Sequence, residues 1–158
     1  MAQQLTATAA AEAGLTTTAL TRLVGIAREA AELGGAELMR HYGRLASIQS
    51  KGRVGDLVTN ADLAAEKVVL DVLAAATPDI AVLAEESGAA GEQDGLRWCV
   101  DPLDGTTNFA HSYPFFATSI GLTFRQTPVL GAIAVPFLGE VYWGAPGIGA
   151  FCNEQAIT

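Results

Sequence analysis

Basic residues are scarce in this chain. Its 158 residues include nine Lys and Arg against 17 Asp and Glu, which gives a formal net charge of −8 at pH 7. Non-specific nucleic-acid binding needs clustered Lys and Arg to neutralise phosphates, so we expect no nucleic-acid partner. An anionic substrate would have to be met by a metal cation, a helix N-terminus or a few well-placed basic side chains.

Cysteines and long apolar runs are scarce as well. Cys99 and Cys152 lie far apart in the sequence, without a C-x-x-C spacing. This favours two core thiols in a reducing compartment over a zinc site or a disulfide. No stretch reaches the ~18 apolar residues of a membrane span. Residues 1–18 lack a basic segment followed by a leucine-rich one, so we expect no secretory signal, no membrane partner and a cytoplasmic location.

The composition that is present suits a single globular domain. Half of the residues are apolar and 16% are charged, which allows a substantial core and makes global disorder improbable. The first residues are rich in Ala and Thr. We therefore expect residues 1–17 to form a flexible N-terminal arm and residues 18–158 to form one domain.

The apolar periodicity predicts helices first and strands afterwards. Residues 18–42 have helical spacing, although the pair Gly34-Gly35 is expected to weaken the middle of the helix. A loop or hairpin follows, and then a helix over residues 60–76. Strands are expected over residues 80–87, 96–100, 115–124, 129–136, 140–145 and 149–153, with a helical turn after Asp104. This order predicts an α+β domain built of packed layers.

Four carboxylates stand at the ends of these predicted elements. Asp62 opens a helix, Glu85 ends one strand, and Asp101 and Asp104 end another. Two unit charges brought to ~4 Å repel by about 4 kcal/mol at an effective dielectric constant of ~20. Hard divalent cations with oxygen ligands relieve such repulsion. The sequence therefore predicts a magnesium site where the strands end.

The residues around the aspartates support this prediction. Pro102 lacks an N–H group and fixes the turn, so that the Leu103 carbonyl could face the metal. Gly105 allows a close approach of the backbone. Thr106 begins a helical turn and offers an N–H group and a hydroxyl where a phosphate would bind. A phosphate held between metal ions and this turn is the expected arrangement.

Structural explanations compete with each of these assignments. The segment T-N-A-D, residues 59–62, is also a capping box, in which Asp62 only stabilises its helix. Glu85 and Glu86 could be solvated loop acids, and D-P-L-D-G-T-T-N could be an ordinary Asp-rich turn. The three motifs together favour the metal site over the three separate explanations.

Four segments of the chain resemble the inositol monophosphatase family. They are GDLVTNAD at 55–62, AEES at 84–87, WCVDPLDGTTNFAHSYPFFATSIGL at 98–122 and GAFCN at 149–153. The order of the motifs and the spacings between them also match. The resemblance implies an alternating αβαβα sandwich, present here as an incomplete one. It further implies a magnesium-dependent phosphomonoesterase that is usually a homodimer.

The resemblance also implies roles for the metal ligands. Glu85, Asp101 and the Leu103 carbonyl would hold a first metal ion. Asp101 and Asp104 would hold a second, together with an aspartate from a later W-D motif that this chain does not contain.

Further roles follow from the same resemblance. Asp62 and Thr106 would orient and deprotonate the water that attacks phosphorus, and the N–H groups of Gly105 and Thr106 would hold the phosphate. Lys51, Asp56 and Glu86 would support the site from the surrounding loops. For Lys51 and Asp56, a surface lysine and a turn-capping aspartate remain open alternatives.

In the family, another stretch follows the segment GAFCNEQAIT. We therefore expect a fragment of a longer product or a natural truncation, in which residues 129–136 and 140–145 lose strand partners and little phosphatase activity remains. The leading function is hydrolysis of a small phosphate monoester, first of all myo-inositol 1-phosphate. The alternatives are a sugar-phosphate, histidinol-phosphate or bisphosphate-nucleotide phosphatase, or a catalytically incomplete metal-binding fragment.

Overall fold

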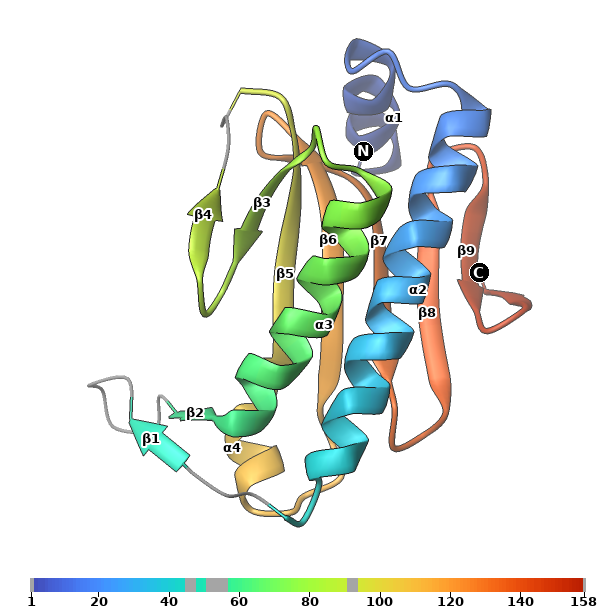
Figure 1. Cartoon of the computed structure of the whole chain (residues 1–158). Coiled ribbons are helices and arrows are strands. Elements are labelled where there is room, and N and C mark those ends of the chain that lie inside the picture. Colours follow the sequence, from blue (N-terminus) through green and yellow to red (C-terminus); the bar gives the residue numbers. More distant parts are fainter. Residues whose placement is uncertain (1, 45–47, 51–56, 91–93, 158) are drawn as a thin grey trace.

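A single eight-stranded sheet forms the framework of the computed structural model, which describes residues 2–44, 48–50, 57–90 and 94–157 (Figure 1). The strand order is β10-β9-β8-β7-β6-β5-β3-β4. In chain order, the strands are β3 (Ala81–Ala84), β4 (Gly88–Ala90), β5 (Leu96–Asp104), β6 (Ala117–Phe124), β7 (Thr127–Val135), β8 (Glu140–Ala145), β9 (Gly149–Cys152) and β10 (Gln155–Ile157). Neighbours run antiparallel except β3 and β5, which are parallel.

Two long helices cover one face of this sheet. Helix α2 (Thr17–His41) and helix α3 (Asn60–Ala76) lie side by side, α2 over β6 and β7 and α3 over β5 (Figure 1). Thr16 caps α2 by accepting the N–H of Ala19 at 3.2 Å. The side chains buried between the helices and the sheet include Leu23, Ala27, Val69, Leu73, Trp98, Ile120, Leu122 and Ala132. The expected layered α+β architecture is confirmed.

Two shorter helices and a small ribbon complete the described elements. They are α1 (Ala2–Glu12), α4 (Thr106–Ala110) and the antiparallel pair β1 (Ile48–Ser50) and β2 (Leu57–Thr59). The ribbon matches the hairpin expected between the two long helices. No helix in the part of the chain that the structure describes is long and apolar enough to cross a bilayer.

The pair Gly34-Gly35 supports helix packing rather than weakening α2. A Cβ atom on Gly34 would lie 2.8 Å from Val69 Cγ2 and 3.0 Å from Thr118 Cγ2. A Cβ atom on Gly35 would lie 3.3 Å from Pro136 Cβ. The missing side chains therefore let α2 approach both α3 and the sheet, which is a benefit that the cost of glycine in an isolated helix does not reveal.

The N-terminal segment differs from the flexible arm that its composition suggested. Residues 2–12 form helix α1, which contacts β7. Ala9 and Ala10 on this helix are only 5% and 3% exposed and belong to the main core. Alanine has the highest helix propensity, and burial of these small side chains fixes the helix against the domain. Residues 2–12 are therefore a packed helix rather than a flexible arm. The expectation that residues 18–158 form one domain is not affected.

The last strands also differ from expectation. β7 pairs with β6 and β8, and β8 pairs with β7 and β9, so both have partners on each side. The additional strand β10 extends the sheet beyond β9. Part of the apolar surface that remains lies on the sheet face opposite α2 and α3, where four large side chains are at least one third exposed: Leu83, Ile133, Tyr142 and Ile157.

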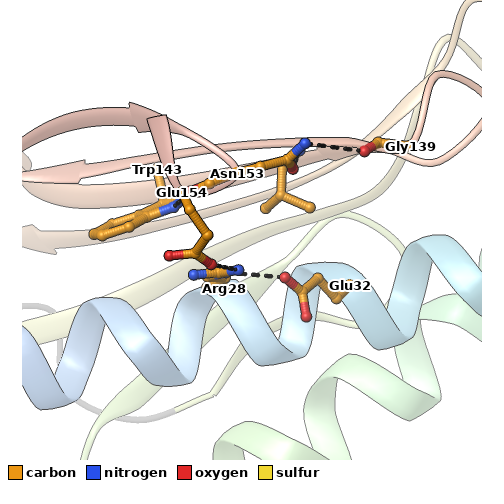
Figure 2. Close-up of polar contacts among 7 residues, drawn as sticks. Arg28, Glu32, Gly139, Trp143, Asn153 and Glu154 are labelled. Atoms are coloured by element: carbon orange, nitrogen blue, oxygen red, sulfur yellow. Dashed lines mark hydrogen bonds and ion pairs between the residues drawn. The ribbon is translucent and has the colours of Figure 1, made fainter. Parts of the chain in front are cut away.

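A polar cluster joins the C-terminal strands to α2 (Figure 2). Arg28 on α2 binds Glu154 at 2.6 Å and Glu32 at 2.9 Å, and its guanidinium lies 5.5 Å from the centre of the Trp143 ring. The indole N–H of Trp143 donates to the carbonyl of Asn153 at 2.8 Å. The turn between β9 and β10 is thus held against the helix layer by charge and by aromatic contact.

Gly34 and Gly25 in α2 give a matched test of the packing, because only the first of them is packed against other elements. Gly34→Ala should lower the free energy of unfolding by about 1–3 kcal/mol, because the new methyl group overpacks the contact with Val69 and Thr118. Gly25→Ala has no heavy atom within 4 Å of its new Cβ and should raise the free energy of unfolding by about 0.5–1 kcal/mol. Urea denaturation of both variants measures the difference. Equal effects would contradict the close approach at Gly34.

Candidate active site

The end of β5 carries two aspartates on the same face of the sheet. Asp101 pairs with Ser119 on β6, and Asp104 pairs with Ala117. The three-residue step on β5 thus opposes a two-residue step on β6, which is a β-bulge. In a regular strand, residues three apart would point to opposite faces. The extra residue brings Asp101 and Asp104 to one side, and this is how the sequence spacing D-x-x-D becomes a pair.

Glu85 reaches the same place from the neighbouring strand. β3 runs parallel to β5, with Ala84 opposite Val100. The N–H of Glu85 continues the ladder by donating to the Val100 carbonyl at 3.1 Å. Glu85 and Asp101 are therefore the next residues along two adjacent parallel strands, and their side chains lie beside each other.

The electrostatics of Asp101 reflect this crowding. Burial raises the pKa of its carboxyl from 3.8 to about 7, and the adjacent carboxylates of Glu85 and Asp104 act in the same direction. The N–H of Leu103 donates to Asp101 Oδ1 at 3.1 Å and opposes the rise. Because Glu85 and Asp104 lie beside the half-buried Asp101, a negative charge on Asp101 is unfavourable. The Asp101 carboxyl therefore keeps its proton to a higher pH.

The donor set fits a hard cation. Among residues 2–44, 48–50, 57–90 and 94–157, no three His, Cys, Asp or Glu side chains already converge at metal-binding distances. The raised pKa of Asp101 nevertheless places the charges of Glu85 and Asp104 within effective range of it. Carboxylate and carbonyl oxygens are the ligands that Mg²⁺ prefers. The chemistry of these residues therefore suits magnesium.

Asp62 and Thr106 meet through a hydrogen bond. The hydroxyl of Thr106 lies 3.1 Å from Asp62 Oδ1 and 3.0 Å from the Leu103 carbonyl, so either oxygen can accept its proton. Asp62 is only 1% exposed. Leu103 lies between the Asp62–Thr106 pair and the acids, because its N–H donates to Asp101 and its carbonyl is the alternative acceptor for the single Thr106 hydroxyl proton.

Asp62 also takes part in the capping box that competed with its catalytic assignment. Its Oδ2 atom accepts the N–H of Thr59 at 2.8 Å and the hydroxyl of Thr59 at 2.5 Å. The helix cap is Thr59, and Asp62 is the third helical residue of the box. One oxygen thus stabilises α3 and the other contacts Thr106, so the two roles do not exclude each other.

Gly105 forms the turn between Asp104 and α4. Its backbone is left-handed, with φ of 89°, and a Cβ atom there would lie 3.0 Å from the Phe115 carbonyl oxygen. Both facts require glycine at this position. The close approach observed at Gly105 is to the Phe115 backbone, while binding of phosphate by the N–H groups of Gly105 and Thr106 stays a prediction.

The residues assigned to the surrounding loops divide into two groups. Lys51 and Asp56 lie outside the described residues. The N–H of Glu86 donates to Glu66 Oε2 at 2.9 Å. Sequence reasoning missed Glu66, which is buried on α3. The available signal was an acid at position i+4 from Asp62, between Ala65 and Val69 on the inner stripe of that helix.

A hollow of about 960 Å³ lies next to the acids. Its lining includes Glu85, Asp101 and Ser119 at the polar end and Leu83, Ile133 and Tyr142 along the sheet. The acids thus open onto the same sheet face that α2 and α3 leave uncovered.

Comparison with known proteins agrees with the motifs and the geometry. The profile of the inositol monophosphatase family matches residues 19–158. The chain belongs to the inositol monophosphatase family. It is 47% identical over 133 residues to an inositol-1-monophosphatase of Synechocystis sp., covering 84% of this chain and 46% of that protein. It is 37% identical over 140 residues to a fructose-1,6-bisphosphatase/inositol-1-monophosphatase of Aquifex aeolicus, covering 87% of this chain and 53% of that protein.

Solved structures of this inositol monophosphatase family share the fold. An inositol monophosphatase from Anabaena superposes with a TM-score of 0.75 at 41% identity, covering 88% of this chain and 50% of that one. The extragenic suppressor protein suhB from Bartonella henselae gives a TM-score of 0.80 at 39% identity, covering 85% and 53%. This member of the family thus spans about half the length of the relatives it matches.

The raised pKa of Asp101 predicts how metal-free stability depends on pH. The unfolded chain loses the Asp101 proton near pH 3.8, and the folded chain keeps it to about pH 7. The contribution of this group to the free energy of unfolding is full below pH 3.8 and is lost as the pH rises to about 7. Urea denaturation in EDTA should show this fall, and Asp101→Asn should abolish it.

Asp71→Asn is the matched control for this measurement. Asp71 is an exposed acid on α3, paired with Lys67 at 2.6 Å. It carries the same change of charge outside the cluster and should keep the fall between pH 4 and 7 that the unsubstituted chain shows. An Asp101→Asn profile that runs parallel to that of the unsubstituted chain would contradict the assigned pKa.

Proposed function

We propose that the protein is a magnesium-dependent phosphatase of small phosphate monoesters, with myo-inositol 1-phosphate as the first candidate substrate. The observation that carries this proposal is the meeting of Glu85, Asp101 and Asp104 at one end of the sheet, linked through Leu103 to the Asp62–Thr106 pair. The Synechocystis and Anabaena relatives are named as inositol monophosphatases, which supports the choice of substrate.

The metal ligands in this proposal are Glu85, Asp101, Asp104 and the Leu103 carbonyl. When bound, magnesium neutralises these carboxylates and polarises a phosphoryl oxygen of the substrate. The Leu103 carbonyl remains available as a ligand when the Thr106 hydroxyl directs its single proton to Asp62. The backbone of the β5 bulge holds Asp101 and Asp104 on one side before any ligand arrives.

The proton chemistry falls to Asp62 and Thr106. A water that donates to Thr106 Oγ1 passes its proton to that oxygen, while the Thr106 hydroxyl proton moves to Asp62 Oδ1. The remaining hydroxide attacks phosphorus, and the bond from phosphorus to the ester oxygen breaks. The leaving alkoxide takes a proton from a solvent water, and the proton that Asp62 then releases neutralises the hydroxide left in solvent. The backbone N–H of Thr59 holds the other oxygen of Asp62 and so orients the carboxylate for this transfer.

The groups that bind the phosphate and the choice of alcohol are the remaining parts of the proposal. The N–H groups of Gly105 and Thr106 are the proposed phosphate contacts, because the left-handed turn at Gly105 exposes the start of α4. A second candidate function is hydrolysis of a sugar bisphosphate. The Aquifex aeolicus relative favours this alternative, because it is named as a fructose-1,6-bisphosphatase as well as an inositol-1-monophosphatase.

Assembly and location complete the proposal. We propose a homodimer, because the exposed apolar side chains on the open sheet face favour association. We also propose a cytoplasmic location, because the free cysteines Cys99 and Cys152 suit a reducing compartment.

A phosphate-release panel tests the proposed function. Inositol, sugar, histidinol and nucleotide phosphates are compared with and without magnesium. The panel is run on the 158-residue chain and on a chimera in which this chain replaces the matching half of the Synechocystis relative. We expect magnesium-dependent release by the chimera, fastest with myo-inositol 1-phosphate, and little by the shorter chain. A chimera that folds and releases no phosphate from any substrate would contradict the proposal.

Asp62→Asn separates proton transfer from helix capping. The amide can still accept from Thr59 and donate to Thr106, but it cannot take up a proton at neutral pH. Turnover of the chimera should fall at least about 100-fold. The free energy of unfolding should fall by only about 1–2 kcal/mol, because hydrogen bonds to a charged acceptor become neutral ones. Steady-state phosphate release and urea denaturation measure the two effects.

Thr59→Ala is the control for that experiment. It removes the helix cap at a cost of about 1 kcal/mol and leaves the Asp62 carboxylate and its bond to Thr106 in place. Its turnover should remain close to that of the unsubstituted chimera. Equal losses of turnover in Asp62→Asn and Thr59→Ala would reduce Asp62 to a capping residue.

A further inference from the structure

Glu66 is an acid in a place where acids are rare. It lies on α3 and is only 5% exposed, one helical turn after Asp62. Its neighbours on the buried face of the helix, Ala65 and Val69, are fully buried. A buried carboxylate is costly unless hydrogen-bond donors satisfy it. The position therefore calls for an account of what the Glu66 carboxylate binds.

The Glu66 carboxylate binds the backbone of the turn that follows β3. Its Oε2 atom accepts the N–H of Glu86 at 2.9 Å and lies 3.4 Å from the N–H of Ser87. These residues directly follow Glu85, whose own N–H donates to Val100 at 3.1 Å. The segment that carries Glu85 is thus held from the sheet on one side and from α3 on the other.

This arrangement gives α3 two contacts with the active site. Asp62 and Glu66 are four residues apart and lie on the same face of the helix. Asp62 contacts Thr106, and Glu66 contacts the turn beside Glu85. Glu85 in turn stands next to Asp101, because the two residues follow the paired residues Ala84 and Val100 on adjacent parallel strands. Helix α3 therefore sets the distance between the Asp62–Thr106 pair and the acids at the strand ends.

We infer that Glu66 is a positioning residue for the cation site: its carboxylate holds the turn of Glu86 and Ser87 so that Glu85 faces Asp101. This inference rests on the proposed magnesium chemistry. Charge is part of the role, because a carboxylate oxygen accepts N–H groups more strongly than the neutral amide oxygen of glutamine does. Groups that orient metal ligands typically change metal affinity about 10- to 100-fold when they are altered.

The test compares magnesium binding by the 158-residue chain and by its Glu66→Gln variant. Isothermal titration calorimetry with magnesium chloride should show binding at least about tenfold weaker in the variant. Amide hydrogen exchange of the metal-free proteins, followed by NMR, should show faster exchange at Glu86 and Ser87 in the variant. The amides of α2 should remain unchanged.

Two control variants on the same helix separate positioning from other effects. Asp71→Asn removes one negative charge from the exposed side of α3. Val72→Ala weakens the packing of a partly buried side chain against the main core. Both should bind magnesium as the unsubstituted chain does. If Glu66→Gln does not fold, Glu66→Asp replaces it, since that variant keeps the charge and withdraws the oxygens by one methylene group.

The outcomes distinguish the inference from the function on which it rests. Unchanged affinity in the folded Glu66 variant overturns the positioning role, as does an equal loss in Asp71→Asn or Val72→Ala. Failure of the unsubstituted chain to bind magnesium overturns the proposed metal chemistry and the inference with it. Weaker binding together with faster exchange at Glu86 and Ser87, confined to the Glu66 variant, supports the inference.

Discussion

Repulsion among Glu85, Asp101 and Asp104 is the constraint around which this domain is built. Strand pairing places Glu85 and Asp101 side by side, and the β5 bulge turns Asp104 to the same face. The free chain relieves the repulsion by keeping a proton on Asp101, whose pKa rises to about 7. A divalent cation can replace that proton and convert an electrostatic cost into binding energy.

The helix layer fixes this arrangement from behind. Helix α3 contributes Asp62, which joins Thr59 to Thr106, and Glu66, which holds the turn after Glu85. Helix α2 can lie against α3 and the sheet because Gly34 carries no side chain. Close packing limits the movement of α3. The distance between the Asp62–Thr106 pair and the strand-end acids therefore also depends on residues outside the site, such as Gly34.

Sequence patterns predicted the parts of this structure that local chemistry determines. The helix over residues 60–76 followed from its apolar periodicity, and the turn after Asp104 followed from local sequence. The bulge in β5 was not predictable, because it is defined by pairing with β6. The packing role of Gly34 and the burial of Glu66 also arise from tertiary contacts. In the same way, the first residues form a helix because Ala9 and Ala10 find a core to pack against.

The central claim is that Asp101 holds a proton in the place of a cation. NMR titration of its side-chain carboxyl carbon, with and without magnesium, tests this most directly. The account predicts an apparent pKa of Asp101 near 7 in EDTA and a value below 3.8 in saturating magnesium. An Asp101 pKa that is the same in EDTA and in magnesium would contradict it.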